Sequence, residues 1–319
     1  MSDAELDCLL VELDGRSWTE SNIQQCLRDV RGRVAIGVSS APLDERAAAM
    51  AAQLTVTLAP SGPGRCWVAP RPNDLDMIRA TVARAPRASA ALATLLPLTS
   101  ATPVSQALVA ESFAYSTLLA GPEFRAWREA TPVGTTRPAR DPVVLERRGD
   151  SLTILLNRPE RHNAFSRDVR DGLVVGLELA LADESIQEIQ LAGCGPSFCS
   201  GGDLDEFGTT PDVVRAHLIR VRQSPGLMLH ELRDRVTVHL HGACIGAGIE
   251  LPAFAGRVVA EEDTWFLLPE LRMGLVPGAG GTVSISRRIG RWRTAYLALT
   301  GRRIDVETAL AWGLVDERV

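Results

Sequence analysis

The chain has 319 residues, of which 45% are hydrophobic and 23% are charged, and its formal net charge is −5. Nucleic-acid binding is disfavoured, because binding phosphate backbones needs clustered positive charge and no basic stretch stands out. No run approaches the ~18 consecutive apolar residues of a membrane span, and about two domains are expected at this length.

The N-terminus and the cysteines indicate the compartment. Residues 1–5 are acidic and lack the apolar region of a signal peptide. The cysteines form neither a CxxC pair nor a zinc-type spacing with histidine. We therefore expect reduced thiols in a cytoplasmic protein, without a metal site. Lysine is absent, so any ligand phosphate must be bound by arginine or by backbone N–H groups.

Residues 1–140 form the first predicted domain, an α/β and helical one, in which no catalytic constellation stands out. Its patterns predict a strand, a helix, a strand and two long helices, at residues 8–13, 19–30, 34–38, 74–95 and 103–128. The segment 80–98 is rich in Ala and Leu, a composition typical of a core or an interface. Pro, Gly and Thr cluster without periodicity between residues 130 and 142, which predicts a linker and a domain boundary.

Residues 141–319 form the second predicted domain, in which strands alternate with helices. Strands are predicted at 143–147, 151–156, 188–192 and 236–240, with helices at 166–181 and 211–234. Ser166 is placed to cap the first of these helices. This alternation favours an α/β fold. A dinucleotide-binding fold is not supported, because no GxGxxG follows the first strand.

Two glycine-rich turns follow strands in this domain. The first runs from Phe198 to Leu204 (FCSGGDL) and the second from Leu240 to Leu251 (LHGACIGAGIEL). Small residues let a ligand approach the backbone, and N–H groups at a helix start favour an anion. Each turn alone also fits an ordinary strand-to-helix connection.

Two acidic residues accompany these turns. Glu250 falls among apolar neighbours one turn into the helix after the second turn, and Glu270 ends an apolar strand before the glycine-rich segment 277–281. A buried acid is costly unless it is paired or neutral; alternatively, each faces water. Together the features fit one mechanism: two backbone amides bind the developing enolate oxygen of a thioester, while two carboxylates exchange protons with a water molecule.

These motifs resemble those of the crotonase (enoyl-CoA hydratase/isomerase) superfamily over about residues 143–319. Residues 157–165 resemble its CoA-binding entry segment, and the two turns resemble its two oxyanion-hole motifs. Residues 277–281 and 299–315 match the segments that follow. The resemblance implies an α/β fold, a crotonase-like spiral of ββα turns, assembled as a homotrimer or hexamer.

The resemblance also implies roles for individual residues. The oxyanion donors are the N–H groups of Gly202 and Ala247; Glu270 delivers the α-proton and Glu250 orients the water. The implied CoA-binding residues are Arg161, His162, Ala164, Ser200, Gly201 and Asp203. The implied acyl-pocket residues are Leu267, Leu268 and Phe207. Coenzyme A enters as part of the acyl-CoA substrate, and no other cofactor is expected. Enoyl-CoA isomerisation and a non-catalytic acyl-CoA-binding or assembly subunit are the alternatives.

Three departures from the family stand out. Leu267-Leu268 replaces the small or aromatic residues common before Pro-Glu, and His241 stands where Asn is usual; we interpret His241 as a hydrogen-bonded strand-end residue. The sequence also stops at Val319, before the family's C-terminal helices. Residues 74–128 resemble that tail, and residues 6–130 resemble a shortened crotonase repeat.

We therefore predict that the helices at 74–95 and 103–128 pack where the family's C-terminal helices pack, on this subunit or on a neighbouring one. They should wall the acyl pocket, with Phe113, Tyr115 and Phe124 approaching it. The alternative is an independent appended domain.

Overall fold

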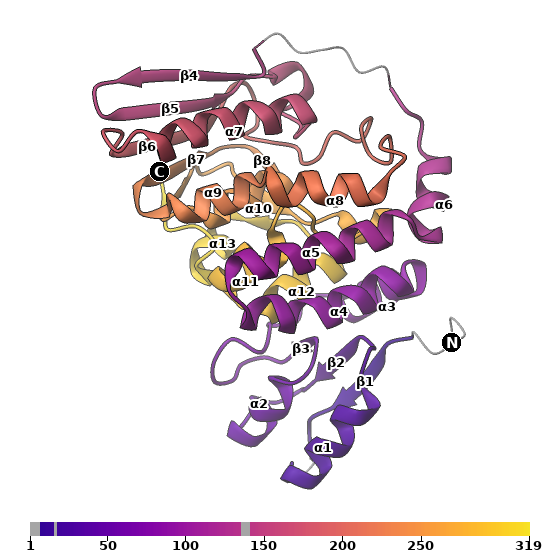
Figure 1. Cartoon of the computed structure of the whole chain (residues 1–319). Helices are drawn as coiled ribbons and strands as arrows, with labels where there is room; N and C mark the ends of the chain where they lie inside the picture. The colour runs from indigo at the N-terminus through magenta and orange to yellow at the C-terminus, as the bar shows by residue number, and fades with distance from the viewer. Residues whose placement is uncertain (1–6, 16–17, 135–140) are drawn as a thin grey trace.

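The computed structural model describes residues 7–15, 18–134 and 141–319. Residues 1–5, on which the signal-peptide prediction rests, and residues 135–140 of the predicted linker lie outside the described residues. Figure 1 shows a small sheet with two helices at one end of the molecule and a larger sheet at the other, with a layer of helices between them.

The small sheet is built from the N-terminal residues. Its strands pair in parallel in the order β1-β2-β3. Its elements are β1 (Leu9–Glu12), α1 (Glu20–Asp29), β2 (Ala35–Val38), α2 (Glu45–Ala51) and β3 (Val56–Leu58). The strands and helix predicted at 8–13, 19–30 and 34–38 are present, because each has its own local signals. Thr19, for example, caps α1 through the Asn22 N–H.

Four helices follow, where the sequence predicted two. They are α3 (Asp74–Arg84), α4 (Pro86–Ala101), α5 (Val104–Leu119) and α6 (Pro122–Ala130). Pro86 and Pro122 stand at the first turns of α4 and α6. Proline is favoured at a helix start but cannot donate a hydrogen bond within a helix, so each predicted helix divides there.

The large sheet has six strands in the order β12-β9-β7-β6-β5-β4. Only β4 and β5 are antiparallel; the other neighbours are parallel. The strands are β4 (Val143–Arg148), β5 (Ser151–Leu156), β6 (Glu188–Gly193), β7 (Val236–Leu240), β9 (Arg257–Ala260) and β12 (Glu317–Arg318). The four strands predicted from the sequence are all present.

A second three-stranded sheet, in the order β11-β10-β8, lies next to the large one. It consists of β8 (Ala243–Ile245), β10 (Trp265–Leu267) and β11 (Ile304–Asp305). β8 and β10 are parallel, so their C-terminal ends meet at one edge. The last part of the second glycine-rich turn, from Gly246 onward, follows β8, and Glu270 follows β10. The pairing of β8 with β10 brings these two segments together.

The helices of this half complete the α/β alternation. They are α7 (Arg167–Ala182), α8 (Val213–Arg222), α9 (Pro225–Glu231), α10 (Ala247–Glu250), α11 (Gly281–Ile289), α12 (Arg291–Thr300) and α13 (Val306–Trp312), with short 3-10 turns η2 (Pro159–Arg161), η3 (Arg233–Arg235), η4 (Pro252–Phe254) and η5 (Glu270–Met273). Ser166 caps α7 as predicted. The helical segment predicted at 211–234 is divided, because Pro225 begins α9.

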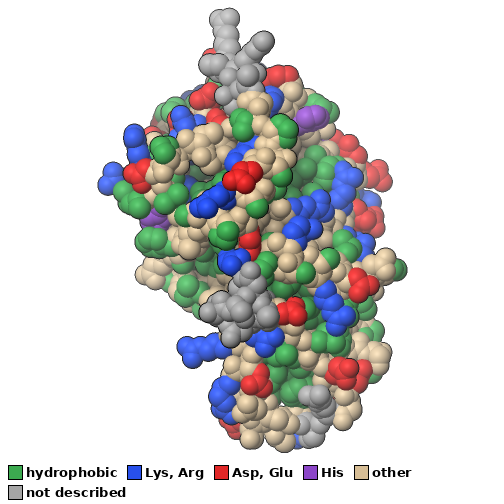
Figure 2. Space-filling model, turned by 90° about the vertical axis from the view of Figure 1, so that its right-hand side faces the viewer, with side chains coloured by type: hydrophobic (Ala, Val, Ile, Leu, Met, Phe, Trp, Pro, Cys, Tyr) green, Lys and Arg blue, Asp and Glu red, His purple; other side chains and the backbone are tan. Residues whose placement is uncertain are grey.

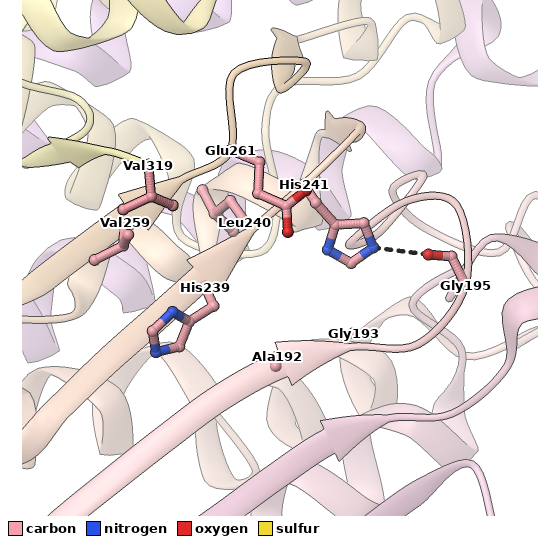
Figure 3. A pocket seen from close by; sticks show the side chains of 9 residues that line it. All are labelled: Ala192, Gly193, Gly195, His239, Leu240, His241, Val259, Glu261 and Val319. Atoms are coloured by element: carbon pink, nitrogen blue, oxygen red, sulfur yellow. Dashed lines mark hydrogen bonds between the residues drawn. The ribbon is translucent and has the colours of Figure 1, made fainter.

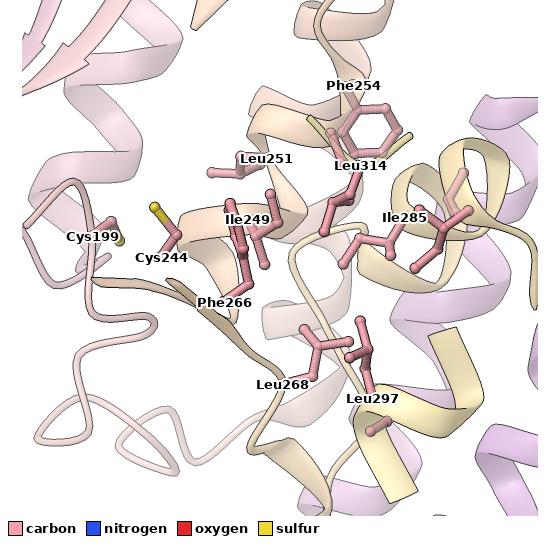
Figure 4. Close-up of a cluster of buried hydrophobic side chains, with 14 of the residues drawn as sticks. Cys199, Cys244, Ile249, Leu251, Phe254, Phe266, Leu268, Ile285, Leu297 and Leu314 are labelled. Carbon is pink, nitrogen blue, oxygen red and sulfur yellow. The ribbon is translucent and has the colours of Figure 1, made fainter. Parts of the chain in front are cut away.

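The helices α3–α6 share one hydrophobic core with the C-terminal half. Buried residues such as Ile78 and Leu92 belong to the same cluster as Phe266 and Leu297. Figure 4 shows part of this cluster around Ile249, with Cys199 and Cys244 side by side at one end. None of the helices in the described part of the chain is long and apolar enough to cross a bilayer.

Polar contacts add to this packing. Asp74, which is 1% exposed, accepts hydrogen bonds from Tyr296 Oη at 2.9 Å and Arg302 Nε at 2.8 Å. Arg287 donates to the carbonyl of Thr99 at 2.9 Å. The helices α3–α6 are therefore bound to the C-terminal half through a continuous interface. Figure 2 shows acidic and basic side chains interspersed on the face that it displays.

Candidate active site

The two glycine-rich turns lie side by side. Cys199 and Cys244 form a parallel bridge, in which Cys199 N–H donates to the Ala243 carbonyl at 3.2 Å and Ile245 N–H donates to the Cys199 carbonyl at 3.0 Å. A β-carbon on Gly248 would lie 2.3 Å from the Cys199 carbonyl oxygen, so only glycine permits this approach. The segment that contains Gly202 is thereby held against the start of α10.

The amides predicted as oxyanion donors have no acceptor among the described residues. Ala247 is the first residue of α10, after Gly246 in a left-handed conformation (φ 49°). The amide of a first helical residue has no acceptor within its helix. Neither the Ala247 N–H nor the Gly202 N–H donates a hydrogen bond within the described ranges. Both amides therefore remain available for a ligand oxygen.

Glu250 ends α10 and is 2% exposed. Its Oε2 atom accepts hydrogen bonds from the backbone amides of Ala279 at 2.8 Å and Gly281 at 2.9 Å. Burial raises the pKa of Glu250 to about 7, although the two amides act in the opposite direction. One oxygen is thus anchored, and the group titrates near neutral pH.

Glu270 begins η5 directly after Pro269 and is 7% exposed. Its Oε2 atom is buried and has no hydrogen-bond partner among the residues that the structure describes. Burial, and then repulsion from Glu250, raise the pKa of Glu270 well above its usual value. A buried carboxyl without a partner is costly, and such groups in folded proteins call for a functional explanation.

The two glutamates converge on Gly246. A β-carbon built on Gly246 would lie 2.6 Å from Glu270 Oε1 and 3.6 Å from Glu250 Oε1. The Oε1 atoms therefore face one small space beside the amide of Ala247, the next residue. This arrangement can place two carboxylates on one side of a ligand and backbone donors close by. Proton transfer next to a stabilised oxyanion is the chemistry that it supports.

Comparison with known proteins identifies the family. The family model for enoyl-CoA hydratase/isomerase matches residues 147–319, which is more than half of the chain. The chain belongs to the enoyl-CoA hydratase/isomerase family. The matched region contains both turns and both glutamates.

Individual members of the family agree with this assignment. The chain is 34% identical over 173 residues to a 1,2-epoxyphenylacetyl-CoA isomerase of Escherichia coli, covering 51% of this chain and 64% of the relative. It is 32% identical over 175 residues to a 2,3-dehydroadipyl-CoA hydratase of the same organism, covering 55% of this chain and 68% of the relative. An enoyl-CoA hydratase structure from Thermoplasma volcanium has a TM-score of 0.52 at 31% identity and covers 56% of this chain and 72% of that one. The chain thus spans about two thirds of these relatives.

The segment predicted to bind CoA in this family member is organised by a buried ion pair. Asp203, whose side chain is 1% exposed, lies between Arg158 at 3.4 Å and Arg161 at 2.9 Å. Arg161 also contacts Asp205 at 2.5 Å and stays 40% exposed. The buried Asp203 therefore holds Arg158 and Arg161 of this segment in place. The sequence interpretation overlooked Arg158, whose burial has no local sequence signal.

The other predicted CoA residues surround this ion pair. His162 is exposed, and its Nδ1 lies 3.0 Å from Ser197 Oγ. The Ser200 N–H donates to the His162 carbonyl at 2.9 Å, which joins the entry segment to the first turn. Ala164 and Gly201 are buried. The segments lie together as the family resemblance implies, and their contacts with CoA stay predictions.

The predicted acyl-pocket residues lie close to the turns. A β-carbon on Gly202 would lie 2.5 Å from the ring of Phe207, so this ring lies against the α-carbon of Gly202. Leu267 ends β10, and its carbonyl accepts a hydrogen bond from the Gly246 N–H at 2.9 Å. Leu268 is 1% exposed and packs in the core. Their contact with an acyl group also stays a prediction.

The three aromatic residues of the N-terminal helices differ in position. Tyr115 lies against the glycine-rich loop, because a β-carbon on Gly278 would lie 2.3 Å from its ring. Phe124 is 4% exposed, and its ring contacts Trp127, which in turn contacts Phe207. The prediction for Phe113 is wrong: it is 58% exposed and stacks on His217 at 4.0 Å.

A separate cavity of about 420 Å³ lies at the ends of the large sheet's strands. Neither Glu250 nor Glu270 lines it. Figure 3 shows that His239, His241 and Glu261 line it. His241 Nε2 lies 3.0 Å from the Gly195 carbonyl oxygen, which agrees with the hydrogen-bonded role predicted for it. No group of three or more metal-ligating side chains suited to an ion occurs within the described ranges.

Proposed function

We propose that the chain is an enoyl-CoA hydratase-like lyase that adds water across the double bond of an α,β-unsaturated CoA thioester, or removes it in the reverse reaction. The observation that carries this proposal is the convergence of Glu250 and Glu270 on Gly246, beside the available amide of Ala247. A hydratase needs two proton-handling groups and an oxyanion site on one substrate, and this arrangement supplies all three.

The proposed reaction conserves atoms and charge. Glu250, anchored through Oε2, orients a water molecule with its other oxygen. As the water oxygen bonds to C3, the π electrons move onto the thioester oxygen, which the Gly202 and Ala247 amides bind. Glu270 delivers a proton to C2. The water molecule gives one of its protons to the pair of glutamates, which then again holds the same number of protons as before.

The protonation states support this division of roles. Glu270 has the more strongly raised pKa, so it is the acid that keeps its proton near neutral pH. Glu250 has a pKa of about 7 and is readily ionised. A pure acyl-CoA binder has no need for a buried, unpartnered carboxyl such as Glu270, so the assembly-subunit alternative is disfavoured.

The test measures one reaction in the full-length chain and in two variants. We expect hydration of crotonyl-CoA, and we expect Glu250→Gln and Glu270→Gln each to lower turnover by about 10² or more, the lower range for a positioned acid or base. CoA affinity should change little. Wild-type turnover in both variants would contradict the mechanism.

Isomerisation is the second candidate, because relatives that match over a similar part of the chain include a CoA isomerase. It predicts activity on a 3-enoyl-CoA instead of on crotonyl-CoA. Measuring both substrates with the same preparation separates the two.

We further propose a cytoplasmic homotrimer or hexamer that acts in acyl-CoA metabolism, as the family resemblance implies. Analytical ultracentrifugation of the full-length chain tests the assembly. A monomer at micromolar concentration would contradict it.

A further inference from the structure

Glu111 is a buried acid that belongs to none of the motifs described above. It lies in the middle of α5 and is the only charged residue of that 16-residue helix. Its exposure is 2%. A lone carboxyl in an apolar helix is expensive to bury unless strong hydrogen-bond donors face it.

Its donors come from the loop that also holds Glu250. Glu111 Oε1 accepts from the Gly280 N–H at 2.7 Å, and Oε2 accepts from the Thr282 N–H at 3.0 Å and the Thr282 hydroxyl at 2.6 Å. Glu250 Oε2 accepts from the amides of Ala279 and Gly281. Four consecutive amides thus alternate between two carboxylates at the N-terminus of α11.

The two carboxylates use their oxygens differently. Both oxygens of Glu111 are occupied by the loop, so neither is available to a substrate. Glu250 uses only Oε2 for the loop, and its Oε1 faces Gly246 and Glu270. Glu111 is therefore placed to act through the loop on Glu250, and not on a substrate directly.

We propose that Glu111 is a positioning residue of the active site. By binding the amides of Gly280 and Thr282, it fixes the loop conformation that presents the Ala279 and Gly281 amides to Glu250. The N-terminal helices thereby complete a site whose other residues lie in the family-matched region. This inference rests on the proposed function, which gives Glu250 its role in orienting water.

The ionisation of Glu250 provides a second readout of the same effect. The groups that interact electrostatically with Glu111 are Glu250 on α10, Glu270 on η5, Arg220 on α8 and Tyr115 on α5 itself. Burial, and then repulsion from Glu250, raise the pKa of Glu111 to about 8. The Ala279 and Gly281 amides lower the pKa of Glu250, so loosening the loop should raise the apparent pKa of Glu250.

The experiment measures kcat and KM for crotonyl-CoA against pH in the wild-type full-length chain and in Glu111→Gln. We expect kcat to fall by about tenfold to a hundredfold, the equivalent of losing hydrogen bonds to a charged group. KM should change less than kcat. The acidic limb of the profile should move to higher pH, because ionised Glu250 loses amides that stabilise it.

Glu123→Gln is the matched control. Glu123 also caps a helix N-terminus from a neighbouring helix, since it accepts from the Arg87 N–H at 2.7 Å and the Ala88 N–H at 3.0 Å. It does not touch the Glu250 loop. We expect this variant to keep the wild-type pH profile. Equal losses of kcat in the two variants, or an unchanged profile in Glu111→Gln, would overturn the proposal.

Two further measurements keep the inference separate from the proposed function. If Glu111→Gln does not fold, Thr282→Val removes one donor to Glu111 and should move the profile in the same direction by a smaller amount; an unmoved profile counts against the proposal. If the wild-type chain hydrates no 2-enoyl-CoA, the proposed function fails, and a crystal structure of Glu111→Gln decides this inference. Glu250 leaving the amides of Ala279 and Gly281 supports it, and an unmoved Glu250 refutes it.

Discussion

The C-terminal half and the N-terminal helices contribute to the candidate site in different ways. The C-terminal half supplies two turns and two glutamates, each marked by small or apolar neighbours within a few residues along the chain. The helices supply Glu111, whose loop partners are 169 and 171 residues away in the sequence. Residues marked by local chemistry can therefore be found one motif at a time, whereas a long-range partner becomes visible only when the chain folds.

The largest expected effect is a loss of stability. It tests whether Asp203, a residue of the predicted CoA-binding motif, also stabilises the folded chain. Asp203→Asn leaves the buried Arg158 with only the exposed Glu160 at 4.0 Å, and removing one partner of a buried pair costs about 3–5 kcal/mol. The control is Asp183→Asn, because Asp183 and Arg147 form a more exposed pair whose attraction is screened by water, so its loss should cost much less. Urea unfolding of both variants gives the comparison; equal losses would show that Asp203 does not organise the entry segment.

The next effect concerns catalysis in the C-terminal half. Ala247→Pro removes one oxyanion donor at the first position of α10, where proline is otherwise accommodated. We expect turnover to fall by about 10²–10³. Ala247→Gly keeps the N–H and should retain most of the activity. Full turnover in the proline variant would mean that the site binds the oxyanion elsewhere.

A third comparison concerns the pH dependence of stability, which involves both regions. Burial raises the pKa values of Glu111 and Glu250 to about 8 and about 7, and that of Glu270 well above its usual value. The unfolded chain releases these protons from about pH 4.3 upward, while the folded chain retains them. Stability should therefore fall as the pH rises from about 4.3 through the folded pKa values, and then level off.

Thermal unfolding between pH 4 and 9 at constant ionic strength measures this slope. Glu270→Gln should flatten it, because one buried ionisation is removed. Glu146→Gln is the control, since that side chain is 56% exposed. A wild-type melting temperature that rises across this range would contradict the assigned directions.

Much of the C-terminal half could be predicted from the sequence because its signals are local. Strands at 151–156 and 236–240 and the Ser166 cap lie where they were predicted. The fold class followed from the order of the motifs. The three divided helices were predicted too long, because apolar composition continues through Pro86, Pro122 and Pro225 and a periodic pattern alone does not locate a break.

Two residues near the site, Phe113 and Glu111, were misplaced or missed because spacing along the chain gives neither the direction of a side chain nor its distant partners. Phe113 was grouped with Tyr115 because both are aromatic and two positions apart, but residues two apart on a helix point in different directions. Tyr115 consequently meets the loop while Phe113 is 58% exposed. A single charge in the apolar α5 was the available signal for Glu111, although its partners could not be inferred from spacing.

The alternating amides also constrain how the loop can change over evolutionary time. An insertion or deletion of one residue between Ala279 and Thr282 would exchange the amides offered to the two carboxylates. Larger side chains are limited as well, since a β-carbon on Gly281 would lie 2.7 Å from Glu250 Cγ. We expect homologues that retain both acids to keep this segment at constant length and with small residues, so that α5 and the loop diverge only as a pair.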